Sequence, residues 1–381
     1  MMTTTGSKSY DEVVTSVLHG AKDLRLEYRR LSAPESFEVQ VAIKATGLCG
    51  SDLHYFNHYR NGDIIVREPL TLGHESAGVI VAIGSAVTNL KVGDKVALEV
   101  GLPCSKCDLC YSGRYNLCKV LKFRSSAKSF PHYQGTLQER INHSAAFCHK
   151  LPENVPLEMG AILEPLSVAI HGLRRAALKD KATVLIFGAG AVGLLCAAMC
   201  RVNGSKTIII ADIQDNRLEF SIQNGFSDIK ILIPMKRLQT TEEKLAFARE
   251  VSDLIKKDSG IDEIDATFEC TGVESCTQAA IYSTRPGGCI MIIGMGTPIL
   301  TLPISAAALR EIDIRGVFRY ADTYEEAIQL ISNKNPLLPD LSSLITHRFK
   351  GFDKIPLAFD MAGRVKDDSN NLVLKVMITT N

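Results

Sequence analysis

No charge of either sign dominates this 381-residue sequence, because 43 lysine and arginine residues nearly balance 42 aspartate and glutamate residues. The chain therefore lacks the positive field that holds nucleic acid or an acidic membrane surface, and we expect neither as a partner. It also lacks an apolar run of the roughly 18 to 20 residues that a membrane span needs. The N-terminal segment resembles neither a secretory signal nor a transit peptide, so we expect a cytoplasmic protein with a small ligand.

Eleven cysteines are present, and in a reducing compartment clustered thiols bind metal more often than they form disulfides. Four of them, Cys104, Cys107, Cys110 and Cys118, lie close together in a loop that contains proline and glycine. This spacing predicts a closed, structural zinc site, since four thiolates leave no position open for chemistry. Disulfides or unused thiols are the alternative. The remaining cysteines of the second half are expected to be small buried hydrophobic residues.

The hydrophobic pattern changes between the two halves of the chain, whose length and 46% hydrophobic content suffice for two domains. In the first half, residues 38–45 alternate apolar and polar side chains, which predicts a half-buried strand. Similar runs at 77–83 and 95–100 indicate a mainly antiparallel β domain. From about 180 to 318, apolar strands alternate with helical patterns, which predicts a doubly wound α/β domain with a parallel sheet. The expected strands are 183–187, 207–211, 265–269 and 289–293, and the expected helices are 191–202, 216–224, 242–256 and 275–283. After residue 319 we expect a helix at 324–332 and a strand at 371–378 that packs back on the first domain.

A glycine-rich turn follows the first predicted strand of the second half. The segment 188–193 has a GxGxxG pattern between strand and helix, with glycines at Gly188, Gly190 and Gly193 and with Val192 before the last of them. Asp212 ends the next strand. Together these features predict a dinucleotide site with the pyrophosphate at the helix N-terminus. Asp212 is expected to bind the ribose hydroxyls and to repel a 2′-phosphate, which favours NAD over NADP. Arg217 either approaches the same ribose or lies on the helix surface.

A second set of metal donors is dispersed along the sequence. Cys49 precedes Ser51 and His54, and the pair His74 and Glu75 follows a glycine, all in a region that we interpret as mainly strand. Glu164 stands where the β domain gives way to the parallel sheet, and clefts between domains are favoured ligand sites. Spacing alone does not establish that these residues converge.

Seven ordered motifs resemble those of the zinc-containing medium-chain dehydrogenases, in the sorbitol and xylitol (polyol) branch. They are GLCGSDLHY, LGHESAG, the four-cysteine loop, LEPLSVAIHG, GAGAVG, ECTG and GVFRY. The resemblance implies a GroES-like catalytic domain at 1–165 with a zinc lobe at about 101–120, a Rossmann NAD-binding domain at 166–315, and a C-terminal return to the catalytic domain at 316–381.

By the same resemblance, one zinc per subunit is catalytic and one is structural. Cys49, His74 and Glu75 would hold the catalytic zinc, and Glu164 would contact it directly or through water. Ser51 and His54 would carry the released proton to solvent, although their proximity is equally compatible with local backbone contacts. The polyol would contact Tyr55, Phe123, Glu164, Arg319 and Tyr320, and NAD would contact Ile293, Phe318 and Arg319 besides the glycine turn. The implied reaction is reversible oxidation of a secondary hydroxyl to a ketone, with zinc lowering the pKa of that hydroxyl.

Departures from the family pattern limit the substrate assignment. Arg124, Ser125 and Ser126 follow Phe123 where polyol members usually have Ala-Thr-Pro-Pro, and Tyr324 replaces a common tryptophan. An L-arabinitol 4-dehydrogenase and a broad secondary-alcohol dehydrogenase are therefore the rival activities. A non-catalytic zinc-loop binding protein is the rival from another class. The oligomeric state of the family implies a homotetramer or dimer, in which a segment such as 287–294 could pair across subunits.

Overall fold

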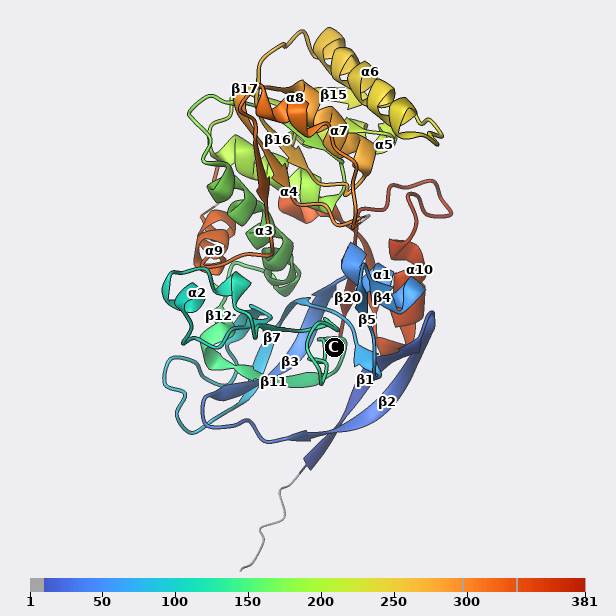
Figure 1. Ribbon diagram of the computed structural model, residues 1–381. Helices are drawn as coiled ribbons and strands as arrows, with labels where there is room; N and C mark the ends of the chain where they lie inside the picture. The colour runs from blue at the N-terminus through green and yellow to red at the C-terminus, as the bar shows by residue number, and fades with distance from the viewer. Residues whose placement is uncertain (1–9, 297, 334, 381) are drawn as a thin grey trace, which may run out of the picture. The chain divides into compact units, whose positions relative to one another are not determined.

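The computed structural model of the chain describes residues 10–296, 298–333 and 335–380, so the expectations drawn from the first nine residues lie outside the described residues (Figure 1). Its described residues form two compact units: residues up to 164 together with those from 345 onward, and residues 165–344. We call these the catalytic unit and the nucleotide unit. No helix within the described residues is long and apolar enough to cross a bilayer.

Antiparallel strands dominate the catalytic unit. Its largest sheet has seven strands in the order β12-β8-β7-β3-β20-β19, with β11 paired to β3, and a second sheet has the order β2-β1-β6. The strands of these sheets are β1 (Tyr10–Gly20), β2 (Asp23–Ser32), β3 (Glu38–Gly47), β6 (Leu70–Thr71), β7 (Glu75–Ile83), β8 (Lys95–Leu98), β11 (Arg140–Ser144), β12 (Cys148–Lys150), β19 (Ile345–Lys350) and β20 (Lys375–Thr379). Two short two-stranded sheets also belong to the unit: β4 (Arg60–Asn61) with β5 (Ile64–Ile65), and β9 (Gly101–Leu102) with β10 (Lys122–Phe123). Its helices are α1 (Gly50–His58), α2 (Asp108–Tyr111) and α10 (Ile355–Ala362).

Strand β3 is more buried than its alternating pattern predicts. Val39 and Val41 lie in the core, but Gln40 between them is also buried. The amide of Gln40 donates to Asn142 of β11, a neighbour that the sequence pattern does not reveal. Gln40, on the second face of β3, is therefore hydrogen-bonded to a neighbouring strand and withdrawn from water.

A six-stranded parallel sheet forms the nucleotide unit, in the order β15-β14-β13-β16-β17-β18. Its strands are β13 (Thr183–Phe187), β14 (Thr207–Asp212), β15 (Ile229–Leu232), β16 (Ile264–Glu269), β17 (Thr284–Ile292) and β18 (Asp313–Gly316). Its helices are α4 (Ala191–Val202), α5 (Asp215–Gln223), α6 (Thr241–Ser259), α7 (Glu274–Ser283), α8 (Ile304–Ala308) and α9 (Tyr324–Ser332), while α3 (Leu157–Ala176) contains the boundary between the units. The predicted α/β class, with an antiparallel catalytic part and a doubly wound parallel sheet, is confirmed.

Two sequence-based expectations about this unit are wrong. The chain returns to the catalytic unit at residue 345 rather than at 316, because β18 extends the parallel sheet and Arg174 of α3 bonds to the backbone of Asp322. The segment 287–294 does not offer a free edge for subunit pairing, since β17 already pairs with β16 and β18. The strand at the end of the sheet is β18.

Candidate active site

Helix α1 begins immediately after Cys49, so this region is a helix and not the strand-like segment that we expected. Asp52 in the first turn accepts a hydrogen bond from the backbone N–H of Cys49 through Oδ2, at 3.2 Å. An acidic residue in the first turn favours the helix because it complements the exposed N–H groups and the helix dipole. The start of α1 thereby fixes the backbone that carries the Cys49 thiol.

Cys49, His74 and Glu75 converge, with one ligand atom of each lying within 4.8 Å of the others. The pairing of β3 with β7 explains the convergence, since Gly47 lies opposite Glu75 in this antiparallel pair. Gly47 also leaves space for the carboxylate, because a Cβ at Gly47 would lie 2.3 Å from Oε2 of Glu75. A thiolate, an imidazole and a carboxylate are zinc donors, and three protein ligands leave one position open for substrate.

Glu164 is not part of this donor group, although it lies in the same unit and is buried. Its charge is close enough to help raise the pKa of Lys375. A role for Glu164 at the metal or the substrate stays a prediction.

The carboxylate of Asp52 is completely buried beside the donor group. Its Oδ1 lies 3.3 Å from Nδ1 of His74 and accepts hydrogen bonds from the backbone N–H of Gly73 and the hydroxyl of Ser125. Burial raises the pKa of Asp52, but His74, Ser125 and Gly73 outweigh that effect and hold the pKa below its ordinary value. Burial lowers the pKa of His74, whereas Asp52 and Cys49 raise it well above the usual value. A carboxylate beside a ligand histidine orients the imidazole and makes it a better donor.

Lys375 of β20 neutralises Glu75 in the core of the catalytic unit. Its ammonium donates to both carboxylate oxygens of Glu75 at 2.8 and 2.7 Å and to the carbonyl oxygen of Leu48 at 3.1 Å. Burial lowers the pKa of Lys375, but Glu75, Cys49 and Glu164 reverse the effect and raise it. The sequence analysis did not identify Lys375, because a lysine in a predicted strand is usually solvent-exposed.

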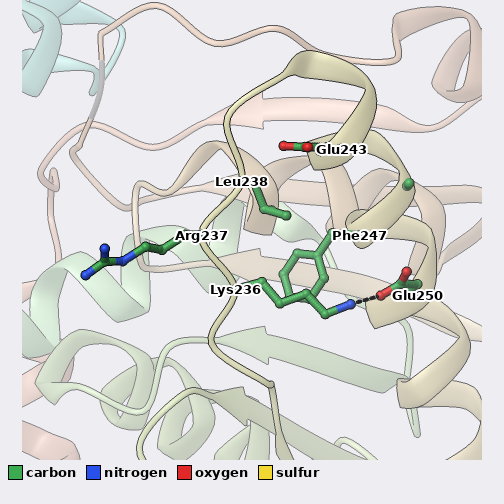
Figure 2. Close-up of a pocket in the computed structure, with 7 residues that line it drawn as sticks. Lys236, Arg237, Leu238, Glu243, Phe247 and Glu250 are labelled. Atoms are coloured by element: carbon green, nitrogen blue, oxygen red, sulfur yellow. Dashed lines mark hydrogen bonds and ion pairs between the residues drawn. The ribbon is translucent and has the colours of Figure 1, made fainter.

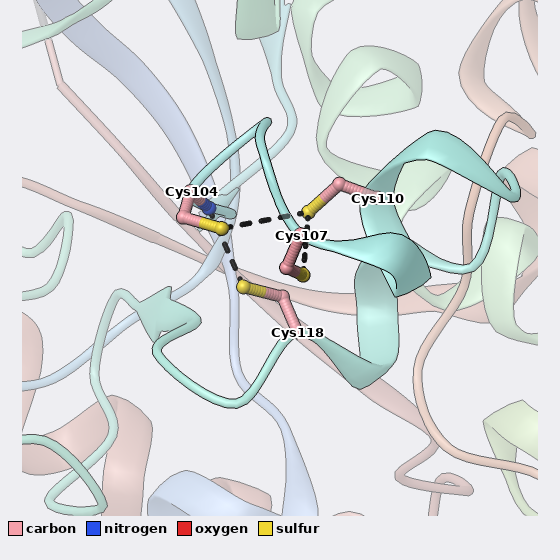
Figure 3. Close-up of side chains that lie close together, drawn as sticks. All are labelled: Cys104, Cys107, Cys110 and Cys118. Carbon is pink, nitrogen blue, oxygen red and sulfur yellow. Dashed lines mark hydrogen bonds between the residues drawn. The ribbon is translucent and has the colours of Figure 1, made fainter.

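The predicted four-cysteine cluster is assembled in the structure. Figure 3 shows the four side chains pointing toward one another, and their sulfur atoms all lie within 4.8 Å. The Sγ atoms of Cys104 and Cys110 are 3.9 Å apart, and those of Cys107 and Cys110 are 3.5 Å apart. Such separations are close to the ~3.8 Å that a tetrahedron with zinc–sulfur bonds of about 2.3 Å requires. A backbone N–H of Lys106 is the main reason that the pKa of Cys104 falls to about 6, which favours the thiolate that zinc binds.

The predicted relay and substrate residues of the catalytic unit lie on α1 and β10. Ser51 is half-buried and His54 is exposed on α1, one turn apart. Tyr55 is buried, and its hydroxyl accepts a hydrogen bond from the backbone N–H of Ala127 at 3.2 Å. Phe123 is buried with its ring 5.7 Å from that of His74. Phe123 is thus next to a metal donor, while the contacts of all four residues with a substrate stay predictions.

The nucleotide unit forms the predicted glycine turn between β13 and α4. Gly188 has a φ of +98°, and a Cβ at Gly193 would lie 1.8 Å from the carbonyl oxygen of Gly188. Both positions therefore require glycine. Asp212 at the end of β14 accepts hydrogen bonds from the backbone N–H groups of Ala189 and Gln214, at 2.7 and 2.8 Å. The carboxylate is held beside the turn, as expected for an acid that selects the ribose.

Arg217 lies at this turn rather than on the outer surface of α5. Its Nη1 atom is 4.0 Å from the position of a Cβ at Gly190, and its side chain is half-buried. The buried Nε atom has no hydrogen-bond partner within the described residues. A buried, unsatisfied guanidinium nitrogen beside a glycine turn suits an anionic or hydroxyl-bearing ligand such as a dinucleotide.

The other predicted nucleotide and substrate contacts follow β17 and β18. The backbone N–H of Val317 donates to the carbonyl oxygen of Ile292, which sets residues 317–319 beside the end of β17. Ile293 and Phe318 are partly exposed there, and the guanidinium of Arg319 lies 4.7 Å from the centre of the Phe318 ring. Tyr320 is buried with its ring 5.6 Å from that of Tyr324. Their ligand contacts stay predictions.

A shallow pocket beside α6 contains none of the predicted site residues. Figure 2 shows that Lys236 reaches Glu250 across the ring of Phe247, and the ammonium of Lys236 lies 5.1 Å from the centre of that ring. Glu243 caps α6 together with Thr240. The Lys236–Glu250 ion pair and the Glu243 cap therefore stabilise the local fold.

Two family models match the chain. The alcohol dehydrogenase GroES-like domain covers residues 35–153, and the zinc-binding dehydrogenase domain covers residues 191–333. Sorbitol dehydrogenase of Gallus gallus is 39% identical over 91% of this chain and 92% of its own length. L-idonate 5-dehydrogenase of Vitis vinifera is 36% identical over 94% of both chains.

Solved structures agree with these sequence relatives. A crystal structure of an Escherichia coli oxidoreductase of unknown specificity is 27% identical, with a TM-score of 0.85 over 97% of this chain and 100% of that chain. The predicted oxidoreductase class is confirmed. These matches favour it over the rival interpretation as a non-catalytic zinc-loop protein. The chain therefore belongs to the zinc-dependent medium-chain dehydrogenases, in the branch that contains the sorbitol dehydrogenases.

Proposed function

We propose that the protein is a zinc-dependent, NAD-linked polyol dehydrogenase that reversibly oxidises a secondary hydroxyl of a sorbitol-, xylitol- or L-iditol-type substrate to the ketose. The convergence of Cys49, His74 and Glu75 is the observation that carries this proposal. Relatives named sorbitol dehydrogenase cover nearly the whole chain and support the polyol class.

Zinc and NAD, when bound, supply a Lewis acid for the substrate hydroxyl and an acceptor for the hydride. Cys49, His74 and Glu75 would hold the metal, and Asp52 would fix the orientation of the His74 imidazole. Ser51 and His54 would pass the released proton along one face of α1 to solvent, which the exposure of His54 permits. Glu164 would act near the donor group without belonging to it.

Asp212 and Arg217 would bind the adenosine ribose of NAD at the turn formed by Gly188, Gly190, Val192 and Gly193. The carboxylate of Asp212 has no compensating cation in the adjacent Ile213, so a 2′-phosphate would be repelled. Ile293, Phe318 and Arg319 would complete the cofactor site. Tyr55, Phe123, Arg319 and Tyr320 would contact the polyol.

We also propose a cytoplasmic location and a homodimer or homotetramer. The zinc lobe needs four reduced thiols, which a reducing compartment maintains. β18 forms an edge of the parallel sheet, and its Ile314 is exposed. Ile299 and Leu309, in the segments that lead from β17 to β18, are 82% and 87% exposed. A second copy covering these side chains would remove apolar surface from water.

Oligomeric state can be tested by light scattering of the variant Leu309→Glu. We expect the wild type to be dimeric or tetrameric and the variant to shift to a smaller species. Leu357→Glu is the matched control, because Leu357 is exposed in the catalytic unit. A monomeric wild type would exclude the proposed assembly.

Activity can be tested by following NADH formation with sorbitol, xylitol, L-arabinitol, L-idonate and a simple secondary alcohol, each with NAD and with NADP. We expect turnover of sorbitol or xylitol with NAD, and loss of turnover after treatment with a zinc chelator. A clear preference for L-arabinitol or L-idonate would make that compound the assigned substrate and would leave the fold and the reaction type unchanged. Activity that survives complete removal of zinc would refute the mechanism.

A further inference from the structure

The loop that departs from the family pattern begins with a firmly anchored arginine. Arg124 is buried, and its guanidinium donates to the carbonyl oxygens of Gln134 and Asn142 at 2.9 and 2.5 Å and to Nδ1 of His143 at 3.2 Å. The guanidinium also lies 4.4 Å from the centre of the Tyr133 ring. These contacts attach the start of the loop to β11 and fix the backbone of the next residue.

Ser125, the next residue, is held in an unusual conformation. Its φ of +64° lies in the left-handed region, where glycine is the favoured residue. The side chain is buried, and Oγ donates to Oδ1 of Asp52 at 2.7 Å. A glycine would fit this backbone with less strain, but it would remove the hydroxyl. Strained residues of this kind persist where the side chain has a task.

Asp52 is connected to two of the three metal donors. Its Oδ2 accepts the backbone N–H of Cys49, while its Oδ1 lies 3.3 Å from Nδ1 of His74. The backbone N–H of Gly73, the residue before His74, also donates to Oδ1. Ser125 supplies the hydrogen-bond donor to this carboxylate that comes from the loop.

The same loop also contacts Tyr55 on α1, since the backbone N–H of Ala127 donates to the tyrosine hydroxyl at 3.2 Å. Ser125 and Ala127 thus approach two residues of one helix that are one turn apart. A displacement of the loop would affect the metal donors and Tyr55 together.

We infer that Ser125 is a positioning residue of the catalytic metal site: its hydroxyl fixes the carboxylate of Asp52, which in turn holds the imidazole of His74 and the backbone of Cys49. This role rests on the proposed function only in requiring zinc at Cys49, His74 and Glu75. Without the hydroxyl, one buried oxygen of Asp52 loses a hydrogen bond, and the carboxylate gains freedom to turn away from His74.

The test is the rate at which zinc passes from the protein to a chromogenic chelator, in the absence of substrate and cofactor. The variants are Ser125→Gly and Ser125→Ala, with Ser126→Ala as matched control. The hydroxyl of Ser126 accepts the backbone N–H of Lys128, two residues away. Cys49→Ala identifies the phase of release that belongs to the catalytic site. Loss of a partner behind a metal ligand typically weakens metal binding about 10- to 100-fold.

We expect release from the catalytic site to accelerate at least about tenfold in both Ser125 variants and to change less than about twofold in Ser126→Ala. Ser125→Gly should unfold at a denaturant concentration closer to that of the wild type than Ser125→Ala does, because glycine suits the positive φ and this gain offsets part of the lost hydrogen bond. Equal acceleration of zinc release in both variants would therefore not be explained by a general loss of folding. Wild-type release rates in both Ser125 variants would overturn the inference.

A double variant tests the route through Asp52. In an Asp52→Ala background, adding Ser125→Ala should leave the release rate unchanged, whereas a further tenfold acceleration would show that Ser125 acts by another route. Because no substrate is present, an enzyme that binds zinc but oxidises no polyol would refute the proposed function without affecting this result.

Discussion

The ammonium of Lys375 lies 2.8 and 2.7 Å from the two carboxylate oxygens of Glu75, and both side chains are at least 95% buried. Glu75 is also a member of the catalytic donor group. One buried carboxylate therefore pairs with a lysine and, in the proposed function, would also hold the metal ion.

Replacing Lys375 by methionine should destabilise the protein mainly when the metal is absent. Breaking a buried ion pair costs about 3–5 kcal/mol, because the remaining charge stays buried without a partner. Bound zinc would place a positive charge beside Glu75, so the free energy of unfolding should fall less in zinc-loaded protein. Denaturant unfolding of both proteins with and without zinc measures the fall in each metal state. Lys350→Met on the neighbouring strand is the control, since Lys350 is exposed; an equal loss in both metal states would contradict the expectation.

Replacing Cys110 by serine should empty the zinc lobe and leave the catalytic site occupied. We expect the zinc content per chain to fall from about two to about one, with a lower melting temperature, because the lobe has little core of its own. Elemental analysis and calorimetry measure the two effects. Cys148→Ala, a buried cysteine outside the lobe, should keep both metal ions. Full zinc content in Cys110→Ser would speak against the four-thiolate site.

Replacing Asp212 by asparagine should weaken the preference for NAD over NADP. Asparagine keeps an acceptor for the turn but removes the charge that repels a 2′-phosphate. We expect the ratio of kcat/KM values for the two cofactors to change at least about tenfold, which corresponds to about 1.4 kcal/mol. Asp215→Asn is the control, since Asp215 lies nearby on α5 and pairs with Lys230. An unchanged ratio of the two kcat/KM values in the Asp212 variant would show that Asp212 does not select between NAD and NADP.

His143 should make the fold sensitive to acid. Burial and the nearby Arg124 lower the pKa of His143 to about 3, whereas the unfolded chain has a histidine pKa of about 6.5. The contribution of the neutral His143 to the free energy of unfolding is therefore complete above pH 6.5. It is lost as the pH falls toward 3, by at most about 1.4 kcal/mol for each pH unit.

The variant His143→Gln isolates this effect. Between pH 7 and pH 5, the unfolding free energy of the wild type should fall by about 2 kcal/mol relative to that of the variant. His58→Gln, which replaces an exposed histidine, is the control for the substitution itself. A parallel pH dependence in wild type and His143→Gln would contradict the expected pKa.

Features defined by local sequence could be predicted closely. The strand 183–187 and the helix 191–202 occur with the expected bounds, because the turn between them requires glycine at fixed positions. The four cysteines also converge as predicted, since all four are contained in one short lobe.

Features that depend on strand register could not be derived from the sequence alone. Cys49 and His74 approach because β3 and β7 pair with Gly47 opposite Glu75, and no local pattern specifies that register. Asp52 was missed because an acid between functional residues resembles an ordinary helix-start residue. Its burial, and that of Lys375, depends on the packing of distant segments.

The discontinuous catalytic unit has a consequence for biosynthesis. Glu75 and Lys375 are 300 positions apart, with the whole nucleotide unit between them in the chain. At roughly 5–20 residues per second, a ribosome would make the lysine about 15–60 s after the glutamate. The nucleotide unit is synthesised during that interval, and throughout it β3 has yet to pair with β20. In the nascent chain, Cys49, His74 and Glu75 therefore exist for many seconds without the ammonium of Lys375. A metal ion that binds before the chain leaves the ribosome would have to bind before β20 joins the sheet.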